Sequence, residues 1–510
     1  MKFHIIVFGC QMNYSDSARI KAILTNGWRT RSDSIADADI VLFDTCSVRQ
    51  KSEDKVFGLL KEIPKSKKIW LTWCMVQHYL KTGKIIKQRD NKETKSLQLG
   101  NFVGGVKTKN PTIIWWNEED LEGYEKYDNP TGDYLFVNHA FNPLHKKMAM
   151  KFPHIELLFR IDDVGMLPRM IQALGYTIAP DVDIFNEYTG ILPQGTNQLM
   201  DAQSKTAYVP ISTWCSQFCA YCIVPYSRGL EKNRPVSEIL VEVKHHLDNG
   251  IKEIVLLGQI VNKHPDFVQI VKEVLKMEWL VWLRYTSPYP TYYSKELLEL
   301  HETEEKLCPH IHMPLQAGSD LVLKKMFRGY TVEQYKWFVD NIRALKRPIS
   351  ITTDIIIGFC DETEEDFVWS LELAKYGKFD MIFMGIYSPR PGTLWAKKYE
   401  DNVSREEKKA RRQRMNTLLR DMSEENNKAE LGTTRLMMVN KIEDGFFSGY
   451  SDNFKTVVVK TPSPLAQRFF ADAQNDSENL HWWNSVKLGD FVKVKITSTE
   501  SLKIFGELVL

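Results

Sequence analysis

The sequence of 510 residues has few cysteines, no long apolar run and almost no net charge. Its eight cysteines are too sparse to hold together a disulfide-rich extracellular scaffold. No segment approaches the roughly 20 uncharged apolar residues that a membrane-spanning helix needs. The first residues soon include polar side chains and lack a small-residue cleavage site, which argues against a signal peptide. We therefore expect a cytoplasmic protein with no membrane partner. Separately, we expect it to act as a monomer.

The composition excludes disorder as the dominant state. Hydrophobic residues make up 43% of the chain and charged residues 26%, with a formal net charge of +2. At roughly 150 residues per domain, a chain of this length holds about three domains. A nucleic-acid partner stays open, but any basic surface has to be local because the overall charge is nearly balanced.

Three cysteines in the first eighty residues each follow an apolar run. The cysteines are Cys10, Cys46 and Cys74, and the runs span residues 3–8, 39–43 and 68–73. Segments with helical character come after each run, which predicts a parallel α/β sheet. Ligands gather beyond the carboxyl ends of such strands, so the three thiols would converge on one edge if the strands are neighbours. Converging thiolates indicate a metal or iron–sulfur site; the alternative is three cysteines packed as small hydrophobic residues.

A second group of cysteines forms a CxxxCxxC loop of Cys215, Cys219 and Cys222. A zinc finger needs a fourth ligand nearby, but the next cysteine is Cys308 and the nearest histidines fall in a predicted helix. Three thiolates on a 4Fe–4S cluster leave one iron open. This spacing resembles the signature of the radical S-adenosylmethionine (SAM) superfamily, in which the open iron binds SAM. That resemblance places Tyr221 near the SAM adenine.

After this loop the chain alternates between strand-like and helical segments. The expected strands span residues 208–213, 253–257, 281–285, 310–314, 349–356 and 381–387. Six such units are fewer than the eight of a closed barrel, so we expect a partial (β/α)6 TIM-like barrel with its site at the C-terminal face. The candidate SAM-binding residues at these strand ends are Gly258, Gln259, Ser287, Gln316, Ser319 and Asp354. Each of them alone is also compatible with ordinary turn chemistry.

The longer motifs resemble the methylthiotransferases, and within that family the MiaB-type tRNA enzymes. The matching segments include FGCQMNYSDS, DTCSVRQKSEDKV, WCMVQ, CSQFCAYCIVPYSRG, RYTSPYP, HMPLQAGSD, TDIIIGF and YSPRPGT. They cover roughly residues 1–80 and 205–440, and a weaker likeness continues to residue 510. Cys360 and Asp361 replace the Pro-Gly usual after TDIIIGF, which puts only that local turn in doubt.

The resemblance implies a radical SAM enzyme with two 4Fe–4S clusters. The loop cysteines would hold the SAM-cleaving cluster, and the three N-terminal cysteines an auxiliary cluster that carries the sulfur to be transferred. One SAM would methylate that sulfur and a second would yield the radical that abstracts hydrogen from carbon 2 of N6-isopentenyladenosine at tRNA position 37. The implied partners are the tRNA anticodon stem-loop, an electron donor such as flavodoxin or ferredoxin, and a sulfur or iron–sulfur carrier.

The last eighty residues resemble a TRAM domain, a small OB-like β-barrel that binds RNA. Alternating runs at 436–439, 456–460 and 491–497 predict strands, and Gly445, Gly449 and Gly489 predict turns. Exposed aromatic side chains and basic rims bind RNA in such barrels. The candidate RNA-binding residues, here and in the barrel motifs, are Arg228, Arg234, Arg390, Phe446, Tyr450 and Lys455. The aromatic residues are equally compatible with packing a small barrel.

Three domains are therefore expected. They span residues 1–200, with an insertion near 82–150, then residues 201–430 and 431–510. The insertion is either a tRNA-contacting extension or a scaffold without a catalytic role. Two alternative functions stay open: a methylthiotransferase acting on threonylcarbamoyl-adenosine or on a ribosomal protein, and a non-catalytic RNA-binding protein stabilised by metal.

Overall fold

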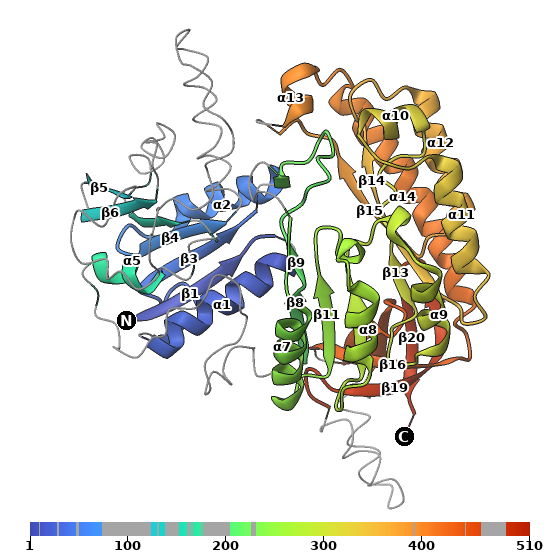
Figure 1. Cartoon of the computed structure of the whole chain (residues 1–510), viewed down its shortest axis with the longest axis horizontal. Coiled ribbons are helices and arrows are strands. Elements are labelled where there is room, and N and C mark those ends of the chain that lie inside the picture. Colours follow the sequence, from blue (N-terminus) through green and yellow to red (C-terminus); the bar gives the residue numbers. More distant parts are fainter. Residues whose placement is uncertain are drawn as a thin grey trace, which may run out of the picture. The chain divides into compact units, whose positions relative to one another are not determined.

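The computed structural model shows two compact units (Figure 1). It describes residues 1–9, 11–27, 30–46, 50–73, 124–129, 132–137, 205–225, 231–390, 393–443, 445–460 and 486–509, with short stretches between 152 and 176. The first unit contains Met1–Leu199, Ser212–Glu238 and Ser388–Tyr399, and the second Met200–Ile211, Ile239–Tyr387 and Glu400–Leu510. The CxxxCxxC loop thus belongs to the same compact unit as the N-terminal cysteines. The domain boundaries expected near residues 200 and 430 stay predictions.

The N-terminal sheet is parallel at its centre, as expected. Its strand order is β2-β1-β3-β4-β7-β6-β5. The parallel strands are β1 (Lys2–Val7), β2 (Thr30–Arg31), β3 (Ile40–Thr45), β4 (Lys68–Trp73) and β7 (Ile155–Phe159). All six residues of β3 are buried. Helix α1 (Gln11–Gly27) follows β1, and α2 (Gln50–Glu62) follows β3.

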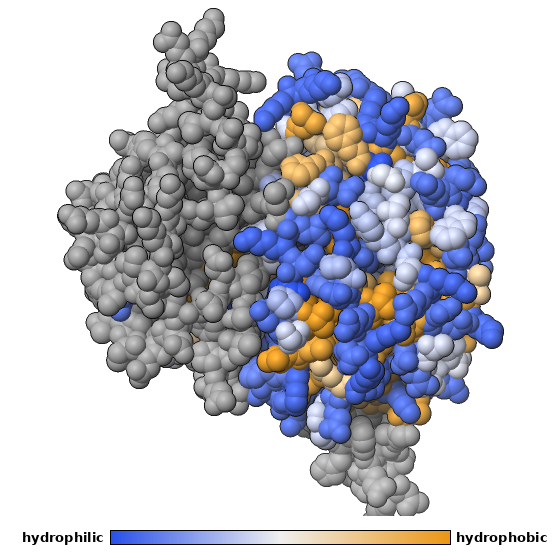
Figure 2. Space-filling model, in the orientation of Figure 1, coloured by the Kyte–Doolittle hydropathy of each residue, from blue (hydrophilic) through white to orange (hydrophobic). Residues whose placement is uncertain are grey.

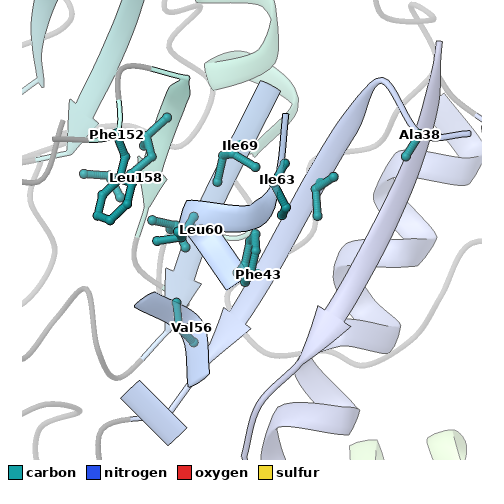
Figure 3. Close-up of a cluster of buried hydrophobic side chains, with 11 residues drawn as sticks. Ala38, Phe43, Val56, Leu60, Ile63, Ile69, Phe152 and Leu158 are labelled. Carbon is teal, nitrogen blue, oxygen red and sulfur yellow. The ribbon is translucent and has the colours of Figure 1, made fainter. Parts of the chain in front are cut away.

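Helix α2 covers one face of this sheet through a row of apolar side chains (Figure 3). Val56, Leu60 and Ile63 recur at helical spacing and pack in one cluster with Phe43 of β3 and Ile69 of β4. Each is at most 5% exposed. Burial of this row fixes which way α2 faces, and therefore where every other residue of the helix lies.

The expected insertion contributes two strands to the edge of the same sheet. Strands β5 (Tyr124–Asn129) and β6 (Gly132–Val137) form an antiparallel hairpin, and β6 runs parallel to β7. Helix α5 (Leu167–Ala173) comes after β7. The remainder of residues 82–150 lies outside the described residues. These two strands support a scaffolding role for at least this part of the insertion.

The second unit contains the predicted parallel strands. Strands β8 (Thr206–Pro210), β11 (Glu253–Leu257) and β12 (Trp282–Tyr285) pair in parallel, as do β13 (His310–His312), β14 (Ser350–Ile357) and β15 (Met381–Ile386). The two sets form separate three-stranded sheets, in the orders β12-β11-β8 and β13-β14-β15. An isolated parallel bridge joins Leu283 of β12 to Leu307, three residues before β13. Together the six parallel strands and their helices correspond to the expected partial barrel. This confirms the expected fold class.

Helices connect these strands, and capping side chains satisfy the backbone at the start of three of them. They are α7 (Val236–Asp248), α8 (Phe267–Leu275), α9 (Lys295–Thr303), α10 (Asp320–Lys325), α11 (Val332–Arg343) and α12 (Glu364–Gly377). Reciprocal capping boxes start α11, through Thr331 and Gln334, and α12, through Thr363 and Asp366. The long helix α14 (Arg405–Lys428) leads to the C-terminal region.

The C-terminal region is a closed five-stranded barrel, in agreement with the OB-like expectation. Its order is β16 (Thr434–Glu443), β17 (Phe446–Ser451), β18 (Thr456–Lys460), β20 (Lys503–Leu508) and β19 (Phe491–Glu500). Gly445 and Gly489 have positive φ and form turns as predicted. The turn predicted at Gly449 is wrong, because this residue lies inside β17, where a Cβ would stand 1.7 Å from the Met438 carbonyl oxygen. Close strand approach explains this glycine.

Hydrophilic side chains predominate on the visible face of the described residues, with hydrophobic ones in small groups between them (Figure 2). Within the described ranges, no helix is both long enough and apolar enough to cross a membrane.

Arg284 joins the partial barrel to the C-terminal barrel within the second unit. Its Nε donates to Glu253 Oε1 at 2.8 Å, while its two terminal nitrogens donate to the carbonyls of Ser451 (2.9 Å), the last residue of β17, and of Asp452 (2.8 Å), which follows it. The guanidinium also lies over the rings of Trp282 and Phe454. Both members of the Arg284–Glu253 pair are only 7% exposed.

We expect Arg284→Met to destabilise the protein by about 3–5 kcal/mol, because it leaves the Glu253 carboxylate buried without its charge partner. The measurement is the free energy of unfolding in urea. Arg414→Met is the matched control: the Arg414–Glu364 pair is 47% and 55% exposed, so its loss should cost under about 1 kcal/mol. Equal costs for the two variants would contradict the role given to Arg284.

Candidate functional site

The strands that precede the three N-terminal cysteines are adjacent and parallel. β1 pairs with β3, and β3 with β4, so their carboxyl ends reach the same edge of the sheet. Cys46 directly follows β3 and is 4% exposed. Cys10 and Cys74 lie outside the described residues. The expectation that the strands are neighbours is confirmed, whereas the convergence of the three thiols stays a prediction.

A buried polar network fixes the backbone at this edge. The Asn13 amide donates to Asp44 Oδ1 (2.7 Å) and to the Thr45 carbonyl (3.2 Å), and the Ser17 hydroxyl donates to Asp44 Oδ2. The Thr45 hydroxyl donates to the carbonyl of Thr72 in β4. Sequence reasoning missed Asn13 and Asp44. The available signal was their polarity beside cysteines at the ends of apolar runs. The network holds α1 against the end of β3, next to Cys46.

The CxxxCxxC loop has a compact, closed backbone. Its flanks, β9 (Ser212–Thr213) and β10 (Lys232–Asn233), pair antiparallel. The Cys222 N–H donates to the Cys219 carbonyl at 2.9 Å. Trp214, directly before the first cysteine, and Phe218, between the first and second, adopt positive φ angles of 67° and 51°. Backbone hydrogen bonds and backbone conformation therefore define the shape of the segment that carries the three cysteines.

The loop's donor set fits an iron–sulfur cluster. Cys219 is buried, Cys215 and Cys222 are half-buried, and all three are thiols. The Gln217 N–H points at Cys215 Sγ (3.5 Å), the type of hydrogen bond that tunes cluster ligands. Across the described ranges, no three His, Cys, Asp or Glu side chains are placed as ligands of one metal ion. In a 4Fe–4S cluster each cysteine binds a different iron, so the ligands stand wider apart than around one ion.

The predicted SAM-binding residues lie at the carboxyl ends of the barrel strands. Gly258 and Gln259 follow β11, and Ser287, with φ of 56°, follows β12. Gln316, with φ of 73°, bridges to Ile355 of β14 and is 9% exposed. Such left-handed conformations at non-glycine residues are held by their surroundings and occur often at functional sites. The structure thus brings these residues to one end of the parallel sheet.

Asp354 and Ser319 have defined partners in this region. The Asp354 carboxylate is 35% exposed and lies 3.3 Å from His312 Nε2, while His312 Nδ1 lies 2.9 Å from the Thr352 hydroxyl. Ser319 begins α10, and its hydroxyl donates to Asp366 on α12. His312 was not among the predicted site residues, although its alternation with His310 along a strand was visible in the sequence. Contact of these residues with SAM stays a prediction, as it does for Tyr221.

The predicted RNA-binding residues that the structure describes are either aromatic residues with some exposure or buried basic residues. Tyr450 is 43% exposed and stacks on Phe454 (5.1 Å between ring centroids), and Phe446 is half-buried. Lys455 is 9% exposed, and its amine donates to Asp380 (2.6 Å) and Asn427 (2.8 Å). Arg234 is also buried.

Arg390 is buried and forms an ion pair with Glu53, and Arg228 lies outside the described residues. Lys455 and Arg390 are therefore engaged inside the protein. The RNA contacts predicted for the six residues stay predictions, and for Lys455, Arg390 and Arg234 the structure offers no exposed side chain.

Two family models match the chain. The Radical SAM superfamily matches residues 209–374, which contain the CxxxCxxC loop and most of the parallel strands. Uncharacterized protein family UPF0004 matches residues 2–94, which contain the three N-terminal cysteines. The two models therefore divide the six cysteines as the sequence does.

Curated relatives match over the whole length. The tRNA-2-methylthio-N(6)-dimethylallyladenosine synthase of Dictyoglomus thermophilum is 30% identical, over 100% of this chain and 98% of that protein. The enzyme of the same name from Pelotomaculum thermopropionicum is 32% identical, over 90% of this chain and 91% of that protein. Among solved structures, the radical S-adenosylmethionine methyltransferase TsrM of Kitasatospora setae aligns with a TM-score of 0.43 and 11% identity, covering 88% of this chain and 80% of that one.

Proposed function

The chain belongs to the tRNA-2-methylthio-N(6)-dimethylallyladenosine synthase family of radical SAM enzymes, and from this membership we propose that it adds a methylthio group to carbon 2 of N6-isopentenyladenosine at tRNA position 37, next to the anticodon. It is a radical SAM tRNA methylthiotransferase, and its cofactors are SAM and two 4Fe–4S clusters. When bound, these cofactors supply the radical and the sulfur that an unactivated aromatic C–H requires.

The observation that carries the proposal is that both cysteine sets belong to one compact unit. Cys46 stands where three neighbouring parallel strands end, and the CxxxCxxC loop is folded within the same unit. Two separate thiol sets in one unit suit a reaction in which sulfur and radical act on a single base. An RNA-binding protein with a structural metal needs only one closed set of four ligands.

We assign the chain's residues three tasks in this reaction. The ligands of the two clusters would be Cys10, Cys46, Cys74, Cys215, Cys219 and Cys222. The contacts to SAM would be Tyr221, Gly258, Gln259, Ser287, Gln316, Ser319 and Asp354. RNA would be held by the exposed Tyr450 and by Phe446 of the C-terminal barrel, with Arg228 as a further candidate, and the target base would be unstacked for the chemistry.

The proposed partners follow from the same reaction. The anticodon stem-loop of tRNA is the substrate, a flavodoxin or ferredoxin is the electron donor, and a sulfur or iron–sulfur carrier restores the auxiliary cluster. We propose that the protein works as a monomer in the cytoplasm.

The test is nucleoside analysis of tRNA, by mass spectrometry, from cells that lack the protein and from cells that express it. We expect 2-methylthio-N6-isopentenyladenosine only with expression, and none with the Cys46→Ala variant. A methylthio group on threonylcarbamoyl-adenosine would assign the alternative substrate. Absence of any methylthio-adenosine would contradict the proposal.

A separate measurement addresses the non-catalytic alternative. After anaerobic reconstitution, we expect the protein to contain iron and acid-labile sulfide. Zinc without iron in a colourless protein would favour a structural metal site and reject the enzyme.

A further inference from the structure

Glu53 lies on the buried face of α2, seven residues after Cys46. It precedes Val56, Leu60 and Ile63 at the same helical spacing, and these three side chains belong to the buried cluster shown in Figure 3. Glu53 itself is 4% exposed. A carboxylate at a core position is costly without a partner, so its retention there needs a reason.

The partner of Glu53 is Arg390, which follows 337 residues later in the sequence. Arg390 Nη2 lies 2.9 Å from Glu53 Oε1, and both side chains are 5% exposed. Burial raises the pKa of Glu53 to about 7, although the positive charge of Arg390 acts in the opposite direction. Buried ion pairs add little net stability, because desolvation offsets their attraction, so stability alone does not explain this pair.

Arg390 belongs to a short segment, Ser388–Tyr399, that we call the strap. The Thr393 backbone N–H and hydroxyl both donate to the Arg390 carbonyl, at 3.1 Å and 2.8 Å, and the Thr393 side chain caps α13 (Leu394–Lys398). The backbone N–H of Trp395 then donates to the carbonyl of Ala220 at 3.3 Å. Ala220 lies between Cys219 and Cys222. The strap therefore contacts both the helix that follows Cys46 and the CxxxCxxC loop.

We propose that Glu53 and Arg390 are positioning residues for methylthio transfer, which hold the helix behind Cys46 and the CxxxCxxC loop in one fixed geometry through the strap. The inference rests on the proposed function, because only a reaction that uses both cysteine sets needs this geometry. A misplacement of about 1 Å between reacting groups can cost about 10²-fold in rate. Neither residue needs to touch the substrate.

The first test needs no cofactor. Alkylation of each cysteine in the metal-free full-length protein is followed by peptide mass spectrometry. We expect Glu53→Gln to raise the alkylation rate of Cys46 at least about tenfold, because loss of the charge pair loosens the start of α2. Cys308, which is 2% exposed in the other compact unit, is the internal reference. Glu62→Gln, at an exposed carboxylate on the same helix, is the matched control and should resemble wild type. An unchanged Cys46 rate would overturn the proposal.

The second test separates positioning from stability. In the double variant Glu53→Leu/Arg390→Met, apolar side chains of similar volume replace the pair, so thermal stability should stay at or above that of wild type. We expect this variant and Glu53→Gln to form at least about tenfold less methylthio product per 5′-deoxyadenosine released, with SAM cleavage within about twofold of wild type. A product ratio restored to the wild-type value in the double variant would show that the pair only stabilises the fold, and so would overturn the proposal.

The two tests distinguish this proposal from the proposed function. If wild type and Glu62→Gln cleave SAM but form no methylthio product, the proposed function fails, while the Cys46 alkylation rates still decide whether the pair holds α2. If wild type forms product and cleavage falls with transfer by the same factor in Glu53→Gln, the positioning role is refuted and the proposed function stands.

Discussion

Replacement of Cys215 by alanine is expected to abolish SAM cleavage, so that no 5′-deoxyadenosine forms above the level of protein-free buffer. Cys215 is one of three cysteines in a loop whose backbone is closed around them, and the Gln217 N–H is directed at its sulfur. With two thiols left, the loop cannot hold a cluster that needs three protein ligands and an open iron for SAM. The measurement is chromatography of 5′-deoxyadenosine after anaerobic reduction with dithionite.

Cys308→Ala is the control for the loss of a thiol elsewhere. Cys308 is buried against Trp282 and Met438. It is distant in sequence from both cysteine sets and belongs to the second unit, whereas they belong to the first. Burial raises the pKa of its thiol to about 12, so it stays protonated and is a poor metal ligand. Cleavage should persist in this variant. Normal cleavage by Cys215→Ala would refute the assignment of the loop.

Replacement of Cys46 by alanine is expected to spare SAM cleavage and to abolish methylthio transfer. SAM cleavage should stay within about twofold of wild type, whereas methylthio transfer to tRNA should be abolished, since only the sulfur-carrying site is lost. Cys46 directly follows a fully buried strand, and the network of Asn13, Asp44 and Thr45 holds the backbone there by itself. The fold should therefore survive the substitution. Product and 5′-deoxyadenosine are measured in the same reaction.

The comparison of the two variants tests the division of labour between the cysteine sets. Cys46→Ala protein should bind roughly half of the wild-type iron after reconstitution. Loss of cleavage in both variants would mean that the sets do not act separately. Methylthio product from Cys46→Ala would mean that the sulfur comes from elsewhere.

The parallel strands were predictable because each is a short buried run ended by a polar or glycine residue. Periodicity alone located β11, and the rule that ligands gather at carboxyl strand ends placed Cys46 at the sheet edge. It also placed Gln316 at the end of the barrel strands. These features depend on residues that are close in sequence, so the sequence carries them directly.

The pairs that join distant segments were not predictable. Arg390 and Lys455 look like RNA contacts when only their neighbours in sequence are considered, because isolated basic residues in loops are usually exposed. Their actual partners, Glu53 and Asp380, are 337 and 75 residues away. The sequence around Gly449 predicts a turn for the same reason, since only the pairing of β16 with β17 reveals how closely the Met438 carbonyl approaches it.

The contact of Arg284 with the Ser451 and Asp452 carbonyls also sets an order of events during synthesis. The ribosome releases β12 well before β17, so for that interval the guanidinium has Glu253 but not its two carbonyl acceptors. Domains generally fold from the N-terminus as they emerge, but the hydrogen bonds of this buried guanidinium are complete only once residues 451 and 452 have joined the fold.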